Sequence, residues 1–459
     1  MLVVEAKLKN GTPEQYQKLD EAIRTSQFVR NTCVRYWMDN KGITRNDLQK
    51  LCSTLAKNKD TPWVTLLNSQ ARQSAADRAW QSINRFYQNC GAPTRHLMAH
   101  VAAPSSRAKI SGKKGFPKFK KYSRSVEYKL TGYKLSDDRR KIKFSDGFKA
   151  GEFDLWCSRR TLVYYSEQQI RRVRVVRRAD GCYCQFLIDV ERQENHEPTG
   201  QVTGIDLGLK EFYTDAQGNT VDNLRYLRRS EKRLKKAQRR LSKRFRKGKK
   251  QSNNYHKQRV KVAKLHLKVS RQREDKAIKD ALALVQSNDL VVYEALKVRN
   301  LVKNRKLSKS ISDASWYQFT EWLNYFAKIY RIVCIAVPPH CTSQDCSVCG
   351  TRVQKSLSTR THQCPNCKTV LDRDHNAAIN ILKKGLKYLG EHLNGTVGHT
   401  ETGASAVLGS PQVEQLAYPN ALGESDLWVL NGNVENLSRL VEQGISNSDV
   451  ERIPRYNAV

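Results

Sequence analysis

The sequence predicts a multidomain α+β protein, and three observations lead to this fold class. The chain has 459 residues, more than a single hydrophobic core usually spans. Helix-type periodicity up to about residue 87 gives way to short alternating apolar and polar runs over 126–191. Two Cys-x-x-Cys pairs then fall within residues 346–367, a pattern typical of a small metal-stabilised domain. We therefore expect three or more domains or subdomains that differ in secondary structure.

The charge of the chain is strongly one-sided. Lys and Arg number 82 against 44 Asp and Glu, which gives a formal net charge of +38. Such a chain repels itself unless a polyanion neutralises it, and nucleic acid is the leading candidate because each bound phosphate releases counterions. The alternative is a solvated charge of the kind that ribosomal proteins and tails carry. The concentration of the charge on patterned segments makes that alternative the weaker one.

Membrane and secreted classes are not expected. The sequence has no run of eighteen apolar residues and no basic-then-apolar leader. Its twelve cysteines do not imply disulfides, because four of them suit a metal site and the others lie scattered in apolar surroundings. We read Cys33, Cys52, Cys157 and Cys334 as core thiols of a soluble protein in a reducing compartment.

The first hundred residues predict one strand followed by a helical domain. Residues 1–10 alternate apolar and polar side chains, which is typical of a strand. Thr12 and Gln15 have the spacing of a capping box, and Pro13 suits the first position of a helix. Two more helices are expected, one over 46–55 and one that starts after Pro62 and ends near Tyr87.

Residues 111–122 interleave cations with aromatic residues, a composition suited to backbone phosphates and stacked bases. Lys118 and Lys120 are the candidate contacts in this segment. The short alternating runs over 126–191 fit a small antiparallel barrel or sandwich, and we expect the opening strand to belong to it.

Residues 224–273 hold 22 Lys and Arg against a single acid, Glu231. Leucines at 227, 234 and 241 mark one helical stripe, and apolar residues at 262, 265 and 269 mark a second, with a break over 248–254. The pattern predicts a helical hairpin with a thin apolar seam. Solvated helix faces usually mix both signs, so single-sign charge favours an RNA or DNA cradle. The candidate contacts are Arg228, Arg239 and Lys243.

Three carboxylates occur at positions that metal binding or catalysis explains better than packing does. Asp206 interrupts an apolar run, Glu294 ends another, and Asp374 opens a predicted helix. A buried carboxylate in a strand is costly unless it is paired or binds metal, although a satisfied core Asp or a turn residue is the ordinary alternative for Asp206. Sheet–helix–sheet patterning allows a ribonuclease-H-like fold to bring the three to one edge of a sheet. Three hard oxygen ligands suit two Mg²⁺ or Mn²⁺ ions at a scissile phosphate.

A second metal site is predicted at Cys346, Cys349, Cys364 and Cys367. Two Cys-x-x-Cys knuckles separated by fourteen residues can close one tetrahedral, structural Zn²⁺ site. Other residues are possible ligands of the two metal sites. Asp372 could replace Asp374, His362 or Cys341 could compete for zinc, and His375 could bind metal but is expected to lie beside the site or at the surface.

Several of these segments closely resemble motifs of the TnpB family, transposon-encoded RNA-guided DNA endonucleases that are similar to the ancestors of type V CRISPR effectors. The resemblance covers about residues 1–385. It rests on GIDLG at 204–208, Tyr293–Glu294, the two cysteine pairs and DRDHNAA at 372–378, with GFPKF at 115–119 and KSISDA at 309–314 as further family segments.

The resemblance implies an active, RuvC-like nuclease with Asp206, Glu294 and Asp374 as the catalytic set. It implies a guide RNA encoded by the element, double-stranded target DNA cut beside a short transposon-adjacent motif, and sequence reading by guide pairing. It also implies a domain order: a wedge β-barrel (1–10 and 101–197), a helical recognition domain (11–100), a RuvC-like nuclease domain (198–340 and 371–390) and a zinc-ribbon target-binding insert (341–370).

Two other functions remain open from the sequence. A DDE-type transposase also has a ribonuclease-H fold, but its carboxylates end in Glu, whereas the order here is Asp, Glu, Asp. An RNA-guided or zinc-dependent DNA-binding repressor would not need the carboxylates. We expect residues 391–459, where acids dominate, to be a disordered tail, and we expect the protein in the cytoplasm of a prokaryote, at the nucleoid when in use.

Overall fold

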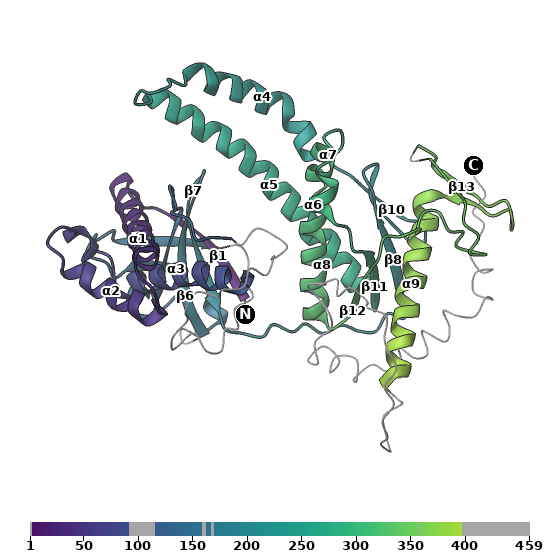
Figure 1. Cartoon of the computed structure of the whole chain (residues 1–459), viewed down its shortest axis with the longest axis horizontal. Helices are drawn as coiled ribbons and strands as arrows, with labels where there is room; N and C mark the ends of the chain where they lie inside the picture. The colour runs from purple at the N-terminus through teal and green to yellow at the C-terminus, as the bar shows by residue number, and fades with distance from the viewer. Residues whose placement is uncertain (1, 91–114, 158–161, 167–168, 357, 397–459) are drawn as a thin grey trace. The chain divides into compact units, whose positions relative to one another are not determined.

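The computed structural model describes residues 2–90, 115–157, 162–166, 169–356 and 358–396. The chain divides into two compact units, Met1–Arg192 and Gln193–Val459 (Figure 1), which are treated separately below. No helix within the described ranges has the length and apolar character needed to cross a membrane. The predicted tail lies outside the described residues except at its beginning, where helix α9 (Arg373–Thr396) continues.

A seven-stranded antiparallel sheet forms the framework of the first unit. In sheet order its strands are β2 (Ser125–Lys129), β6 (Ile170–Arg178), β7 (Gly181–Ile188), β1 (Leu2–Lys9), β5 (Glu152–Cys157), β4 (Lys141–Phe144) and β3 (Tyr133–Leu135). The opening strand therefore pairs inside the sheet, between β7 and β5, as the sequence predicts. The described pairings leave β2 and β3 as edges, so the sheet is a half-barrel where a small barrel or sandwich was expected.

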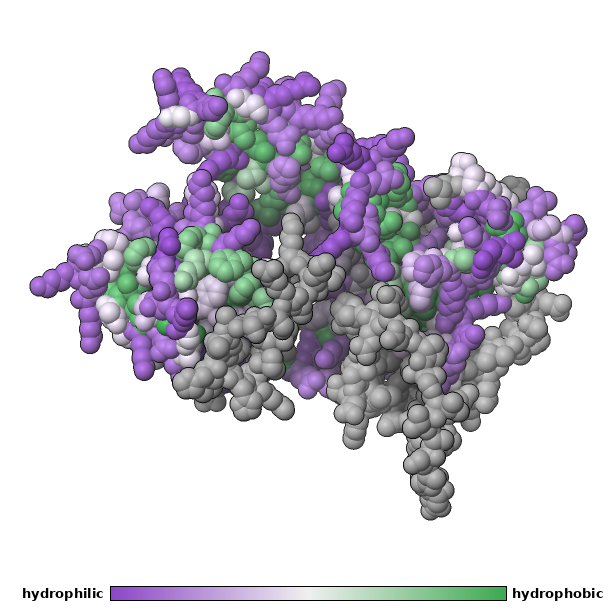
Figure 2. Space-filling model, viewed as in Figure 1, coloured by the Kyte–Doolittle hydropathy of each residue, from purple (hydrophilic) through white to green (hydrophobic). Residues whose placement is uncertain are grey.

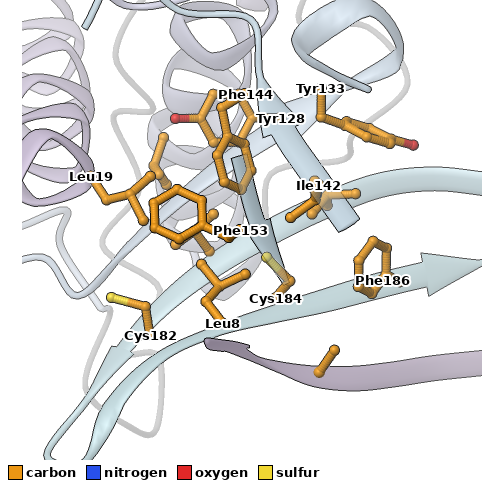
Figure 3. Close-up of a cluster of buried hydrophobic side chains, with 14 of the residues drawn as sticks. Leu8, Leu19, Tyr128, Tyr133, Ile142, Phe144, Phe153, Cys182, Cys184 and Phe186 are labelled. Carbon is orange, nitrogen blue, oxygen red and sulfur yellow. The ribbon is translucent and has the colours of Figure 1, made fainter. Parts of the chain in front are cut away.

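The half-barrel encloses the main core of this unit. Alternate residues of its strands point inward, and Leu8 and Phe153 from two neighbouring strands meet Leu19 of helix α1 (Figure 3). Short 3₁₀ turns at Leu130–Gly132 and Leu162–Tyr164 connect strands of the sheet.

Three helices complete the first unit: α1 (Pro13–Asp39), α2 (Arg45–Lys57) and α3 (Ser69–Asn89). The capping box predicted for α1 is confirmed, because the Gln15 amide donates to the Thr12 hydroxyl (3.3 Å) and the Thr12 amide to the Gln15 side chain (2.8 Å). The predicted start of α3 was wrong. Pro62–Val64 forms a 3₁₀ turn, and the helix begins later because Asn68 caps its first turn.

A five-stranded mixed sheet organises the second unit. Its order is β10 (Thr220–Asp222), β9 (Glu211–Asp215), β8 (Val202–Leu207), β11 (Leu290–Glu294) and β12 (Val333–Val337). Strands β8, β11 and β12 run parallel, whereas β9 and β10 are antiparallel to their neighbours. The apolar run around Asp206 and the one that ends at Glu294 are therefore neighbouring strands of one sheet.

Helices cover both faces of this sheet, as Figure 1 shows. One face packs on α5 (Asn253–Ser287) and α8 (Trp316–Tyr330), and the other packs on α9. The approach of α9 requires Gly204, because a Cβ atom there would lie 2.4 Å from the carbonyl oxygen of Ala378.

The basic hairpin consists of α4 (Tyr226–Arg244) and α5, with short helices α6 (Val298–Leu301) and α7 (Ser308–Ala314) after β11. Leu234 of α4 and Val262 and Val269 of α5 are buried in its seam. Hydrophilic residues cover its outer surface (Figure 2). The predicted end of the hairpin at residue 273 was wrong, because α5 continues to residue 287 and packs on the sheet through a new apolar face. The buried residues of that face are Ala277, Ala281, Leu284 and Val285.

Candidate functional site

Asp206 and Glu294 lie on neighbouring parallel strands and face the same side of the sheet. Tyr293 of β11 pairs with Ile205 of β8, so the residue that follows each of them reaches the same level of the sheet. Ile205 and Tyr293 belong to the core under α5 and α8. Side chains alternate between the two faces of a strand, so the two carboxylates face the α9 side.

Asp374 enters from the first turn of α9, on that same side of the sheet. Asp372 has a different task, since one of its carboxylate oxygens accepts hydrogen bonds from the backbone amides of Asp374 (2.8 Å) and His375 (3.3 Å) and so caps the helix. The Asp374 carboxylate forms ion pairs with Arg373 (2.7 Å) and Arg360 (3.3 Å). Of the two aspartates weighed from the sequence, Asp374 is therefore the one whose carboxylate is not used for capping.

The three carboxylates act on one another electrostatically. Burial raises the pKa of Asp206, and the negative charges of Glu294 and then Asp374 raise it further. Burial also raises the pKa of Glu294, an effect that the hydrogen bond from the Thr342 hydroxyl (2.5 Å) partly offsets. Asp206 and Glu294 therefore disfavour their charged forms, which is the electrostatic setting of a cation site, because a bound cation would stabilise these anions.

The carboxylate oxygens are not gathered at ligand distance from one another. Groups of three or more His, Cys, Asp or Glu residues are possible metal sites. Within the described ranges, only the four cysteines form such a group with all ligand atoms within 4.8 Å of each other. Arginines hold Asp374, and Thr342 holds Glu294, in the positions described above. The donor set of hard oxygens nevertheless fits Mg²⁺ or Mn²⁺, which prefer such ligands.

The four predicted cysteines form one cluster. The sulfur of Cys346 lies 3.6 Å from that of Cys367, and the sulfur of Cys349 lies 3.5 Å from that of Cys364. Their Sγ atoms could hold a single metal ion. His362 and Cys341, the alternatives from the sequence, are not in this group.

The two knuckles of the cluster have matching backbones. The residue after each pair, Gly350 or Lys368, has a positive φ (74° and 60°) and donates its amide to the first cysteine of its pair. The hydroxyl of Thr351 lies 3.3 Å from the Cys349 sulfur. Hydrogen bonds with the side chain and then the backbone of Thr351, together with those to Cys367 and Cys364, lower the pKa of Cys349 to about 5. A low thiol pKa favours the thiolate, which is the form that binds metal. The two-stranded sheet β13 (Thr361–Gln363) and β14 (Val370–Asp372) connects the second knuckle to α9.

The remaining candidates lie apart from the carboxylates. His375 Nε2 lies 3.1 Å from the carbonyl oxygen of Ala216, so the ring contacts a turn of the sheet. Arg228, Arg239 and Lys243 are exposed on α4, and their side chains form no ion pair with an acid of the described part of the chain.

In the first unit, Lys118 is exposed and Lys120 is half-buried. The backbone of Lys120 exchanges two hydrogen bonds of 2.9 Å with the side chain of Asn31 in α1. Burial and the positive charges of Arg78 and Arg30 lower the pKa of the Lys120 ammonium, so this segment lies in a strongly positive environment. Residues 111–114 of the predicted segment lie outside the described residues.

Sequence reasoning missed three residues next to the carboxylates. Arg373 stands between two aspartates of the DRDHNAA motif, which was a usable signal. Arg360 and Thr342 reach the site from the ribbon and from the loop before it. Nothing in their local sequence distinguishes them.

Two family profiles match successive parts of the chain. Residues 185–305 match OrfB_IS605, described as "Probable transposase", and residues 316–381 match "Cas12f1-like, TNB domain". Together these matches include all three carboxylates and all four cysteines. The "TnpB-like protein L79" of Acanthamoeba polyphaga mimivirus is 31% identical over 130 residues, 27% of this chain and 25% of that protein. The chain is similar to proteins of the TnpB family.

Two further relatives match longer stretches of the chain. A "Putative RNA-guided DNA endonuclease" of Streptomyces pristinaespiralis is 37% identical over 225 residues, 48% of this chain and 55% of that protein. The "Putative RNA-guided DNA endonuclease InsQ" of Escherichia coli (strain K12) is 28% identical over 291 residues, 59% of this chain and 68% of that protein. The chain thus spans about half the length of the Streptomyces relative and a quarter of the mimivirus one.

A Cas12f1–sgRNA–target DNA complex, solved by cryo-electron microscopy, matches with 14% identity and a TM-score of 0.46, over 81% of this chain and 83% of that one.

Proposed function

We propose that this protein is an RNA-guided DNA endonuclease of a mobile element. It would bind a guide RNA encoded by the element and cut double-stranded target DNA beside a short transposon-adjacent motif. The names of the Streptomyces and Escherichia relatives support this activity, and the charge of +38 supports nucleic-acid partners. We place its action in the cytoplasm of a prokaryote, at the nucleoid.

The observation that carries the proposal is that three carboxylates from distant parts of the sequence lie on the same side of the five-stranded sheet. Asp206 and Glu294 come from neighbouring parallel strands, Asp374 comes from the helix above them, and the charges of the latter two raise the pKa of the first. The strand order, with a central strand that has a parallel and an antiparallel neighbour, supports a ribonuclease-H-like, RuvC-type domain. The proposed domain boundaries are those that the TnpB resemblance implies.

In this proposal Asp206, Glu294 and Asp374 hold two Mg²⁺ or Mn²⁺ ions. Bound there, the ions would supply an activated water and stabilise the leaving 3′ oxygen of the phosphodiester. The chain's part is to fix the oxygen ligands: the strands set the positions of Asp206 and Glu294, and Asp372 secures the helix turn that carries Asp374. No side-chain nucleophile is required.

The cysteine cluster would hold one structural Zn²⁺. All four protein ligands are cysteines, so the ion would have no open position for catalysis. In the sequence, only a short segment that includes β14 separates the last cysteine from α9. The proposed role of the zinc is therefore to fix the ribbon against the nuclease domain.

The experiment is cleavage of a matched plasmid by the full chain with its co-purified, sequenced RNA, in the presence of Mg²⁺. We expect Asp206→Ala to reduce cleavage by more than about 1,000-fold while RNA affinity stays unchanged, because the carboxylate serves the ions and not the RNA. The matched control is Asp222→Ala, an exposed aspartate on the edge strand β10, which should cleave normally.

Two outcomes would contradict the proposal. Unchanged cleavage by Asp206→Ala would remove these residues from the reaction. Wild-type protein that represses a target promoter without cutting it, and an Asp206→Ala variant that represses equally, would favour the repressor.

A further inference from the structure

Side chains of helix α9 form hydrogen bonds to the loop that leads into the first cysteine knuckle. Asn376, Asn380 and Lys383 are spaced by four and three residues, so they lie on one face of the helix. Asn380 Nδ2 donates to the carbonyl oxygens of Thr342 (2.8 Å) and Asp345 (2.7 Å). Lys383 Nζ donates to the carbonyl oxygen of Ser347 (2.6 Å). The loop Thr342–Ser347 is therefore fixed to the helix by its backbone.

The side chain of Asn376 both accepts and donates a hydrogen bond in this contact, which requires an asparagine at this position. Its Oδ1 accepts from the Ser347 amide (2.9 Å) and its Nδ2 donates to the Asp345 carbonyl (2.8 Å). Asn376 is fully buried and Asn380 is 9% exposed. Asparagine is a weak helix former and a buried amide is costly when unpaired, so two paired ones in a helix interior indicate a positional role.

The same loop reaches the carboxylate site. The Thr342 hydroxyl donates to Glu294 Oε1 (2.5 Å), while the Thr342 carbonyl accepts from Asn380. Thr342 is 5% exposed and Glu294 7%, so water competes little for this hydrogen bond. A continuous path of hydrogen bonds thus runs from Glu294 through Thr342 to Asn380, on the helix whose first turn carries Asp374.

We propose that Thr342, Asn376 and Asn380 are positioning residues that hold the Glu294 carboxylate at a fixed place relative to Asp374. Two carboxylates on separate elements repel each other without a cation, and their ligand geometry must then be set by the protein. The Thr342 hydroxyl orients one of them, and Asn380 ties Thr342 to the helix that bears the other. Asn376 holds the same loop to that helix through the backbone of Asp345 and Ser347. This inference rests on the proposed metal site and adds the residues that set its affinity for divalent cations.

The test is Mn²⁺ binding to the full RNA-free chain, with free Mn²⁺ quantified by electron paramagnetic resonance. Thr342→Val keeps the shape and removes the hydroxyl, so we expect its Kd for Mn²⁺ to rise about 10- to 100-fold. Thr342→Ser restores the hydroxyl and should bind within about threefold of wild type. Thr361→Val, at an exposed threonine of β13, is the matched control and should bind normally.

Asn380→Leu is a second test variant, because the Asn380 side chain bonds only backbone carbonyls and no carboxylate. It should raise the Kd in the same direction, while zinc content and far-ultraviolet circular dichroism stay as in wild type. Equal Mn²⁺ affinity of wild type, Thr342→Val and Asn380→Leu would overturn the inference. If Asp206→Ala also binds Mn²⁺ like wild type, the metal site itself fails. If Asp206→Ala alone loses binding, the proposed function stands and only the positioning role falls.

Discussion

Asp313 of α7 and Arg273 of α5 form a buried ion pair of 2.7 Å at the base of the basic hairpin. The same carboxylate accepts hydrogen bonds from the backbone amides of Leu227 (2.9 Å) and Arg228 (3.2 Å) in the first turn of α4. The residue before α4 provides no side-chain cap, so an aspartate from another helix caps it instead. One side chain thus connects both helices of the hairpin to α7.

Replacing Asp313 with Asn should destabilise the second unit by about 3 kcal/mol, because it leaves the Arg273 charge unpaired in a mostly buried place. Urea unfolding followed by circular dichroism measures the change. Asp275→Asn is the control, since Asp275 forms an exposed ion pair with Lys279 on α5 and should cost less than about 0.5 kcal/mol. Equal effects of the two substitutions would contradict the capping role.

Neutralising Arg228, Arg239 and Lys243 to Gln should weaken RNA binding in low salt and flatten its salt dependence. Each lost phosphate contact should reduce the log–log slope by about 0.7 to 0.9. Fluorescence anisotropy over a salt series gives the slope. Neutralising three exposed lysines of the first unit, Lys41, Lys57 and Lys59, is the control for bulk charge. If both triple variants give the wild-type slope, the hairpin faces solvent in the complex.

Lys120→Gln should act in opposite directions on stability and on RNA affinity. Burial and the charges of Arg78, Arg30 and Arg174 lower the pKa of the Lys120 ammonium, so its charge destabilises the RNA-free fold. We expect a higher Tm without RNA and a salt slope lowered by about one. Lys59→Gln, at an exposed position, should change neither quantity. A lower Tm for Lys120→Gln would show that the ammonium stabilises the fold.

Asp146 should make the first unit less stable as pH rises. Burial raises the pKa of Asp146 to about 6, although Tyr128 donates a hydrogen bond to it (2.6 Å). The native state therefore holds the proton more tightly than the unfolded chain, and stability is lost as pH increases through about 6.

Asp146→Asn removes that loss, so the variant should gain up to about 3 kcal/mol over wild type at pH 8 and almost nothing at pH 4. Chemical unfolding at the two pH values measures the difference. Asp137→Asn, at an exposed aspartate, should give no pH-dependent difference. A constant offset for Asp146→Asn at both pH values would refute the buried-acid explanation.

Zinc should bind the purified chain at one ion per molecule, as measured by atomic absorption. Cys364→Ser removes a buried ligand and should abolish zinc binding and lower the Tm, because the binding free energy of a structural zinc contributes to folding. Cys341→Ser, outside the cluster, should retain the zinc. Loss of zinc in both variants would mean that Cys341 is a ligand.

The sequence alone determined the local chemistry of this protein. Spacing predicted the cysteine cluster, the capping box of α1 and the two basic helices, since each depends on residues that are neighbours along the chain or one helical turn apart. Asp206 and Glu294 were predicted to be functional residues because each places a carboxylate within or at the end of an apolar run.

Tertiary structure decided how these parts meet. The cap that Asp313 provides for α4 and the contacts of Thr342 and Arg360 with the carboxylates join segments that are separate in the sequence. The packing of residues 277–285 on the sheet likewise extends α5 to residue 287. Periodicity and spacing describe only the side chains that one segment carries on each of its faces. The partner it meets is selected by sheet register and by the close packing that Gly204 permits, which no local pattern contains.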